Sequence, residues 1–320
     1  MKTLTVGDRR LSLSQTVPCS VAHRRAVAEV FVTDSARLAE DTAAFAFQVP
    51  RAHSLWGDRL LPYHDPFGVG EAARQAAFVL FHEHLDVPVG VPFSMQRWDL
   101  RVTDLERLRD NERAPLEGVL TYRITRRRMN GALGSLTIEG ALDVDGATAV
   151  TVASDVVFTA RADYEALRAY QRGRKPLQPD APRVTPYAAE AVGRSDRRNV
   201  VIGPAPEPAA ESGSARHRLV VDFSHPAFFD HSYDHVPGPL MNEALRQAAL
   251  VTAHQEGALS SPVASVVRLD ASFRDFAEFE GPLEYTTRLR GTEANGEVLL
   301  AQEIAQFGTV IATAETALRP

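Results

Sequence analysis

Residues 71–82 read EAARQAAFVLFH and residues 243–254 read EALRQAALVTAH, and eight of these twelve positions are identical at a constant offset of 172 residues. The same offset pairs His53 with His225 further upstream. A repeat of this length indicates two copies of one folding unit, and it constrains the fold more than any other stretch of the chain.

The repeated phrase predicts a helix in each copy, and its surroundings predict strands. The phrase contains good helix formers and no proline or glycine, which is typical of a helix of about 12 to 14 residues. Apolar residues alternate with others on both sides of it, as in half-buried strands. Strands are predicted near 26–34, 43–49, 92–103, 116–127, 133–143 and 147–159, and near 198–204, 217–223, 263–275, 282–291, 297–306 and 308–318, with a short helix at 162–173.

This order of elements predicts an α+β fold in which each unit is a central helix wrapped by a curved antiparallel sheet. One unit alone would expose a sheet edge, so two units in tandem are the economical arrangement. Residues 174–190 are rich in proline and polar side chains, as linkers are. We therefore predict an N-terminal domain over 1–165, a linker over 166–190 and a C-terminal domain over 191–320.

The composition excludes several classes of function. The 320 residues are 44% hydrophobic and 24% charged, as in soluble globular proteins. No apolar run approaches the roughly 20 residues that span a bilayer, and the first residues lack the apolar stretch of a secretory signal. A net charge of −6 gives no general basic surface for nucleic acid. The single cysteine, Cys19, fits a reducing compartment, so we expect a cytoplasmic protein that binds neither nucleic acid nor membrane.

Each predicted helix carries polar side chains on one face, which an apolar core does not need. At about 3.6 residues per turn, positions three, four and eleven residues apart fall near one another. The two stripes are Glu71, Arg74, Gln75 and His82 in the first copy, and Glu243, Arg246, Gln247 and His254 in the second. A buried acid, cation and amide each need partners. Two interpretations stay open: an ion pair that fixes the helix to the sheet, or a functional site.

The segment before the second helix, FSHPAFFDHSYDHVPGPLMNE at 223–243, concentrates residues that can do chemistry. Its histidines and aspartates are His225, His231, His235, Asp230 and Asp234. Gly238, between two prolines, predicts a turn whose backbone N–H groups could stabilise an oxyanion at the helix start. Glu243 with a nearby histidine could serve as general base and acid. We therefore expect the second copy to be the working site, and the first to complete the cavity or to hold the fold.

Metal binding is a weaker interpretation of the same loop. Its histidines and aspartates offer nitrogen and oxygen ligands, but their spacing matches no standard zinc pattern and the chain has no HExxH. It also lacks GxSxG, GxGxxG and the Walker A loop, which argues against a serine hydrolase and against a phosphate-binding glycine loop. We expect neither a metal ion nor another cofactor.

Four stretches together resemble the A-factor synthase (γ-butyrolactone synthase) family of Streptomyces and relatives, whose members carry the A-factor biosynthesis hotdog domain twice. They are His23-Arg24 with AEVFVTD at 28–34, PRAH at 50–53, DPFGVGEAARQA at 65–76 and HPAFFDHSYDHVPGPLMNEALRQA at 225–248. The resemblance spans nearly the whole chain outside the linker. The chain departs from the common family pattern at 239–242, where PLMN replaces a more apolar stretch, and at Gly70.

The resemblance implies a tandem double hotdog and an acyltransferase that moves a β-ketoacyl group from acyl carrier protein to dihydroxyacetone phosphate. Intramolecular condensation would then give a butenolide phosphate, or in some relatives a furan, on the route to a γ-butyrolactone-type signalling molecule. Glu243 would be the base, with His225, His231 or His235 as alternatives. Arg246, with Arg74 as the second candidate, would bind the phosphate. Glu71, Asp234 and Gly238 would complete the substrate site.

Two other functions stay open at this stage. A hotdog thioesterase or dehydratase would act on acyl thioesters without a triose acceptor, but it would not need arginine on the helix face. A non-catalytic ligand-sensing protein would not need the loop of histidines and aspartates. The sequence leaves undecided the acyl chain, the product ring and whether the chain is a monomer or a homodimer.

Overall fold

A computed structural model describes residues 2–129, 132–207, 209 and 211–320. The chain divides into two compact units, and each is described by itself. Unit 1 comprises Met1–Gly57 and Tyr63–Arg168, and unit 2 comprises Asp58–Pro62 and Ala169–Pro320. The short segment 58–62 of the N-terminal half therefore belongs to unit 2.

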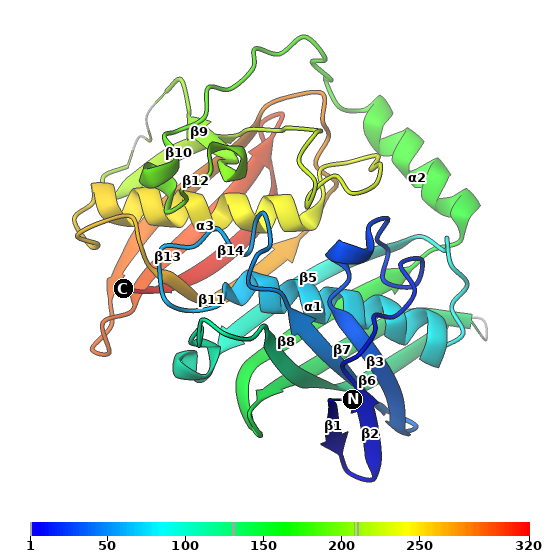
Figure 1. The fold of residues 1–320 in the computed structure, drawn as a ribbon. Helices are drawn as coiled ribbons and strands as arrows, with labels where there is room; N and C mark the ends of the chain where they lie inside the picture. Colours follow the sequence, from blue (N-terminus) through cyan, green and yellow to red (C-terminus); the bar gives the residue numbers. More distant parts are fainter. Residues whose placement is uncertain (1, 130–131, 208, 210) are drawn as a thin grey trace. The chain divides into compact units, whose positions relative to one another are not determined.

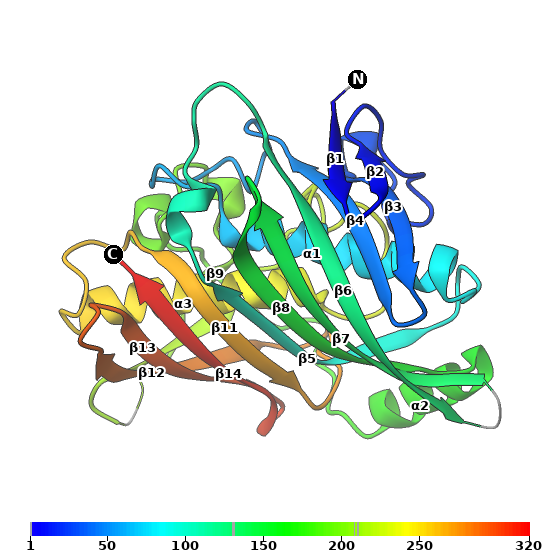
Figure 2. The same cartoon turned by 90° about the horizontal axis from the view of Figure 1, so that it is seen from below.

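Unit 1 is built from an antiparallel sheet in the order β3-β4-β6-β7-β8-β5, with α1 lying against it (Figures 1 and 2). The strands of the sheet are β3 (Val32–Ala39), β4 (Thr42–Val49), β5 (Phe93–Val102), β6 (Leu116–Met129), β7 (Ala132–Val144) and β8 (Ala147–Phe158). Helix α1 (Pro66–Val79) continues into a π-helical turn at Leu80–His84. A separate hairpin of β1 (Thr3–Val6) and β2 (Arg9–Ser12) precedes the sheet.

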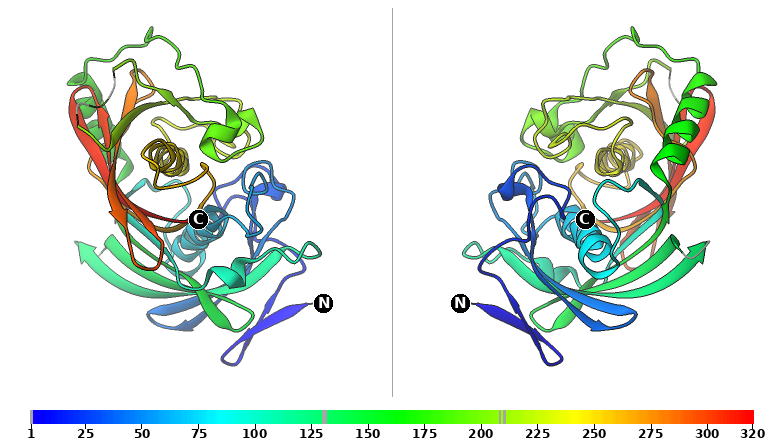
Figure 3. Two further views of the ribbon diagram at one scale, coloured as in Figure 1. Left: turned by 90° about the vertical axis from the view of Figure 1, so that its left-hand side faces the viewer. Right: turned by 90° about the vertical axis from the view of Figure 1, so that its right-hand side faces the viewer.

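Unit 2 repeats this architecture with the strand order β11-β14-β13-β12-β10-β9. Its strands are β9 (Ile202–Pro204), β10 (Ser214–Leu219), β11 (Ser265–Phe273), β12 (Leu283–Thr292), β13 (Val298–Gln306) and β14 (Thr309–Arg319). Figure 3 shows α3 (Gly238–Gln255) end-on, with the orange and red strands curving around one side of it. Helix α2 (Arg161–Gly173) lies between the two central helices in the sequence.

Small side chains allow the central helices to lie close against their sheets. The alanines Ala72, Ala73, Ala76, Ala244, Ala248 and Ala249 are at most 1% exposed. The Tyr122 hydroxyl donates a hydrogen bond to the Ala73 carbonyl of α1 at 2.7 Å. The Gln302 amide donates to the Leu245 carbonyl of α3 at 2.8 Å, at the position equivalent to Ala73. A polar bond between sheet and mid-helix therefore fixes the rotation of each helix, and with it the direction of its polar stripe.

The predicted fold class is confirmed: two hotdog units, each with a central helix and a curved antiparallel sheet. The strands predicted after each helix correspond to β5–β8 and β11–β14, and the helix predicted at 162–173 is α2. The strand predicted at 26–34 is partly wrong, because 27–29 form a 3-10 turn and β3 begins only at Val32. The strand at 198–204 is wrong in the same way, since a 3-10 turn at Arg197–Asn199 precedes β9.

The helices also begin earlier than the repeated phrase. Helix α1 starts at Pro66, where the Asp65 carboxylate caps it by accepting a hydrogen bond from the Phe67 amide at 2.9 Å. Helix α3 starts at Gly238. Glu243 is therefore five residues inside its helix, about 7.5 Å from the start at 1.5 Å per residue, and not in the first turn as predicted.

One buried contact in unit 2 has no counterpart in unit 1. His217 of β10 is 1% exposed, and its ring nitrogens lie 3.2 Å from the Thr252 hydroxyl and 3.2 Å from the Tyr187 hydroxyl. The equivalent positions in unit 1, at the repeat offset, are Phe45 and Leu80. Burial lowers the pKa of His217 to about 4, because the interior disfavours the charged imidazolium.

His217 should make the folding stability depend on pH. Between pH 6.5, the ordinary value, and about pH 4 the unfolded chain binds a proton that the folded chain does not. The free energy of unfolding should therefore fall by about 3 kcal/mol as the pH is lowered through this window. Urea titrations of wild type and of His217→Phe/Thr252→Leu, which copies unit 1, measure this loss. An unchanged pH slope in the double variant would contradict the assignment.

Candidate active site

The central helix of each unit carries a buried carboxylate held by two arginines. In unit 2, Arg194 donates two hydrogen bonds to Glu243 at 3.0 and 3.2 Å, and Arg246 donates two at 2.5 and 3.0 Å. Glu243 is completely buried. One carboxylate and two guanidinium groups leave the cluster with one net positive charge.

The cluster of unit 1 is built in the same way. Arg74 donates two hydrogen bonds to Glu71 at 2.8 and 2.9 Å, and Arg24 donates a third. Arg24 and Arg194 come from the loops before the 3-10 turns at 27–29 and 197–199, at an offset of 170 residues rather than 172. They are site residues that the sequence analysis missed.

In each unit a glutamine of the central helix forms hydrogen bonds with the backbone of the loop that supplies Arg24 or Arg194. The Gln247 amide donates to the Asn199 carbonyl at 2.6 Å and accepts from the Val201 amide at 2.9 Å. In unit 1, Gln75 bonds the Glu29 carbonyl at 2.8 Å and the Phe31 amide at 2.7 Å. Both glutamines also donate to the cluster glutamate. These bonds hold the backbone at the end of each 3-10 turn against the central helix.

The charges of the clusters keep both glutamates ionised. Burial alone would raise the pKa of Glu71, but the neighbouring Arg24 and Arg74 outweigh it and hold that pKa at about 2. In the same way, Arg194 and Arg246 outweigh burial and lower the pKa of Glu243. A carboxylate with so low a proton affinity is a poor general base. The geometry of Glu243 suits a residue that orients the two guanidinium groups. Its assignment as the base stays a prediction, and this arrangement disfavours it.

His225 has a positioning role in unit 2. Its Nδ1 accepts hydrogen bonds from the Ala227 and Phe228 amides, both at 3.3 Å, so Nε2 carries the proton and donates to the Asn199 side chain at 3.0 Å. Asn199 in turn donates to the Asp58 carboxylate at 2.8 Å. His225 therefore supports the loop that carries Arg194. His53 is held in the same way in unit 1, between the Leu55 and Trp56 amides and Glu29.

Asp58, another residue that the sequence analysis did not assign, organises the Arg194 loop. Its carboxylate accepts hydrogen bonds from the Ser195 and Asp196 amides at 2.9 and 3.1 Å, and its carbonyl accepts one from Arg194. Burial would raise the pKa of Asp58, but the hydrogen bonds from Ser195 and Asn199 lower it.

The other two loop histidines lie in different surroundings. The Nδ1 of His235 lies 2.6 Å from the Asp234 carboxylate, and its ring packs on Phe276 at 4.8 Å. His231 packs on Tyr233 at 4.3 Å. His225, His231 and His235 are thus not gathered around one point. In the described part of the chain, no group of three or more His, Cys, Asp or Glu residues is placed to hold a metal ion.

The start of α3 offers one backbone donor. The amides of Leu240 and Met241 already donate to the Pro237 carbonyl at 3.1 and 3.2 Å, and Pro239 has no N–H. Among the described hydrogen bonds, none uses the Gly238 amide. Gly238 is therefore the residue of the predicted turn that could still donate to a substrate oxygen.

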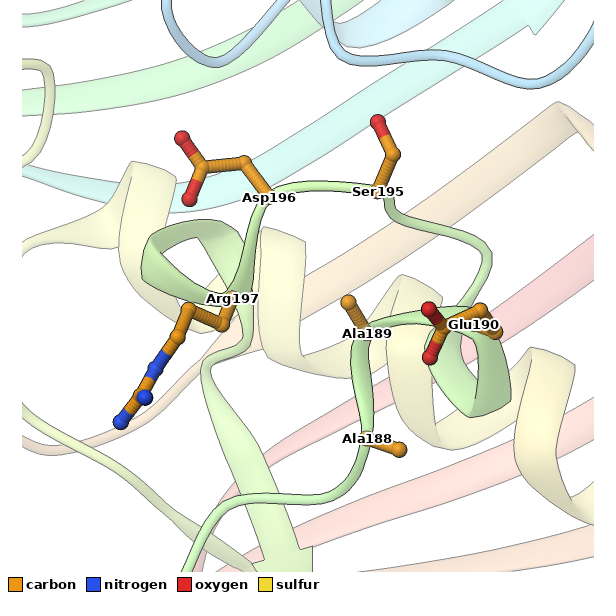
Figure 4. A pocket seen from close by; sticks show the side chains of 6 residues that line it. All are labelled: Ala188, Ala189, Glu190, Ser195, Asp196 and Arg197. Carbon is orange, nitrogen blue, oxygen red and sulfur yellow. The ribbon is translucent and has the colours of Figure 1, made fainter.

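A shallow open hollow of about 520 Å³ lies beside two 3-10 turns of unit 2, Ala189–Val192 and Arg197–Asn199 (Figure 4). It is lined by Ala188, Ala189, Glu190, Ser195, Asp196 and Arg197. None of these residues belongs to the Glu243 cluster, so the hollow is not part of the candidate site.

The fold and the charged clusters define a double-hotdog protein with one polar site per central helix. The profile of the family described as A-factor biosynthesis hotdog domain matches residues 8–159 and 177–320. The chain therefore belongs to the A-factor biosynthesis hotdog domain family, and it is an enzyme.

Curated relatives of this chain carry the name 2-oxo-3-(phosphooxy)propyl 3-oxoalkanoate synthase. The protein from Streptomyces virginiae is 34% identical over 238 residues, which cover 74% of this chain and 77% of the relative. The protein from Streptomyces coelicolor is 30% identical over 312 residues, covering 94% and 91%.

Solved structures share the fold at low sequence identity. A structure described as an oleoyl thioesterase from Lactobacillus plantarum superimposes with a TM-score of 0.52 at 12% identity, covering 87% of this chain and 95% of that one. A second, described as a thioesterase from Novosphingobium aromaticivorans, gives a TM-score of 0.50 at 13% identity over 89% and 97%. At such identities the likeness concerns the fold alone.

Proposed function

We propose that the chain transfers a 3-oxoacyl group from an acyl carrier protein thioester to the hydroxyl of dihydroxyacetone phosphate. The alcohol oxygen attacks the thioester carbon, the C–S bond breaks, and the proton of the hydroxyl passes to the leaving thiolate through a base. The carbon between the two carbonyls of the ester then condenses with the ketone of the triose and releases water. The product is a butenolide phosphate, or a furan, on the route to a signalling molecule made in the cytoplasm.

The observation that carries this proposal is the net positive charge of the Glu243 cluster. Two guanidinium groups on one buried carboxylate leave a charge that a phosphate can neutralise. Arginine matches phosphate with paired N–H donors, and Glu243 holds Arg246 in one orientation. A thioesterase, which releases a free acid to water, has no need of such a charge. The names of the relatives in Streptomyces support the same acceptor.

His235 is the loop residue best arranged to act as the base. Because Asp234 only accepts, Nδ1 of His235 carries the proton in their 2.6 Å hydrogen bond, and Nε2 is left to accept a proton. Among the described contacts, none occupies that Nε2. We propose that Asp234 orients His235, that His225 positions the Arg194 loop, and that Gly238 donates to the thioester carbonyl. His231, Glu243 and Glu71 stay candidates for proton transfer and binding.

Product analysis tests the proposal. Purified protein is incubated with a panel of 3-oxoacyl carrier protein thioesters and dihydroxyacetone phosphate, and the products are identified by mass spectrometry. We expect a phosphorylated ester or its condensed product. Release of free acid at the same rate with and without the triose would support a thioesterase instead. A dehydrated acyl thioester would support a dehydratase. No helix in the described part of the chain is long and apolar enough to cross a membrane.

Replacing the proposed base should reduce turnover. His235→Asn is expected to lower kcat about 100-fold, because general base catalysis typically contributes 10² to 10⁴. Asp234→Asn should give a smaller loss of kcat, because the ring of His235 then loses the carboxylate that orients it through Nδ1. His231→Asn, in the same loop, tests the alternative. A normal rate for His235→Asn together with a large loss for His231→Asn would transfer the role to His231.

A further inference from the structure

We propose that the side-chain amide of Asn242 binds the hydroxyl of the acceptor that is acylated, and so positions this hydroxyl for attack. The inference rests on the proposed transfer to a phosphorylated hydroxyketone and names a residue that binds the acceptor. It concerns only unit 2, because unit 1 has no side chain at the equivalent position, Gly70.

The first observation is a buried acceptor atom without a donor. The Oδ1 of Asn242 is shielded from solvent, and no described residue donates a hydrogen bond to it. The side chain as a whole is only half-buried. A buried carbonyl oxygen without a donor carries a desolvation cost, so a donor on a ligand would relieve it.

The second observation is the place of Asn242 on the helix. Asn242 and Arg246 are four residues apart in α3, so they lie on one face with Cβ atoms about 5–6 Å apart. Bond lengths give a three-carbon chain with an oxygen at each end a span on the order of 5 Å. A triose phosphate whose phosphate binds Arg246 can therefore place its hydroxyl at Asn242. In dihydroxyacetone phosphate the ketone oxygen and the phosphate dianion only accept, so the hydroxyl is the group that donates.

The third observation is that the matching face of unit 1 is closed. A Cβ added at Gly70 would lie 2.9 Å from Cδ1 of Leu100 and 3.4 Å from Cζ2 of Trp98. Even a methyl group there would force neighbouring side chains to move. Arg74, one turn further along α1, therefore has no polar side chain beside it at position 70.

Two residues of β11 are smaller than their counterparts in β5, whereas α3 has Asn242 where α1 has Gly70. Strands β5 and β11 share a bulge, after which they read Arg97-Trp98-Asp99-Leu100 and Arg268-Leu269-Asp270-Ala271. Counted from the bulge, Trp98 and Leu100 match Leu269 and Ala271. The two side chains that close position 70 in unit 1 are therefore replaced by smaller ones in β11, and unit 2 has the amide that unit 1 lacks.

A comparison of two acceptors with and without the hydroxyl tests the proposal. Acetol phosphate (hydroxyacetone phosphate) keeps the ketone and the phosphate of dihydroxyacetone phosphate but has a methyl group in place of the free hydroxymethyl group. Binding of both compounds to the full-length protein is measured by titration calorimetry. We expect wild type to bind dihydroxyacetone phosphate about fivefold to tenfold more tightly, the effect of one neutral hydrogen bond. Asn242→Leu should bind both compounds equally, and Asn242→Ser provides a second variant with a smaller side chain.

The outcomes separate this inference from the proposed function. A wild-type protein that binds neither compound would count against the proposed phosphorylated acceptor itself. If wild type prefers dihydroxyacetone phosphate and both variants keep the same preference, the hydroxyl is bound elsewhere and the role of Asn242 is wrong. Arg246→Ala is the matched control. This variant should weaken the binding of both compounds equally and leave the ratio of their dissociation constants unchanged, because we place Arg246 at the phosphate that they share. Thermal melting confirms that each variant is folded.

Discussion

Glu243→Gln is expected to lower the free energy of unfolding by about 3–5 kcal/mol, because it leaves two arginines buried together without a counter-charge. The side chain of Arg194 is completely buried, and that of Arg246 is 9% exposed. The neutral amide can donate or accept hydrogen bonds, but it cannot offset two positive charges. Urea unfolding at neutral pH measures the loss.

Glu284→Gln in the same unit is the matched control for this variant. Glu284 also accepts hydrogen bonds from two arginines, Arg216 and Arg218, but its carboxylate is 23% exposed. Water and salt screen such a pair, so its loss should cost less than about 1 kcal/mol. Adding Arg194→Met to Glu243→Gln should restore part of the stability, since one unpaired charge is then removed. If Glu243→Gln and Glu284→Gln lowered the free energy of unfolding equally, burial would not determine how much the Glu243 cluster contributes to stability.

The sequence predicts the fold well because helix and strand periodicity are local properties. The doubled phrase places both central helices, and alternating apolar residues place the strands β5–β8 and β11–β14. Helix starts were predicted too late, since the first turns, PFGVG and GPLMN, contain the proline and glycine that otherwise interrupt helices. The hairpin β1-β2 was not predicted. The domain boundaries at 165 and 190 stay a prediction.

The sequence alone predicts only part of the candidate site, because one of the two arginines of each cluster comes from a loop. Helical spacing brings Glu243, Arg246 and Gln247 together, so periodicity finds them. Arg194 pairs with Arg24 only if the repeat offset changes from 172 to 170, and a search at constant offset misses it. A backbone feature supports the shorter offset: His23 and Gly193, which precede these arginines, both have positive φ, at 51° and 70°.

Arg246→Ala is expected to lower kcat/KM for dihydroxyacetone phosphate about 1,000-fold. Two charge-assisted hydrogen bonds to the phosphate contribute roughly 2 kcal/mol each, and about 4 kcal/mol corresponds to a factor of 10³. Glu243 keeps Arg194 as a partner in this variant, so the fold should survive. Inorganic phosphate should inhibit wild type in competition with the triose, and the variant should be insensitive to it.

Arg74→Ala in unit 1 is the comparison that decides which central helix binds the triose phosphate. Arg74 makes the same pair of bonds to Glu71, but its guanidinium also lies over the Phe78 ring at 4.7 Å, where unit 2 has Leu250. An aromatic face already holds that cation, and the adjacent position 70 is closed by Leu100 and Trp98. We therefore expect Arg74→Ala to lower kcat/KM for dihydroxyacetone phosphate less than tenfold. Equal losses in the two variants would mean that both helices bind the triose phosphate, and would contradict the assignment of the working site to α3 alone.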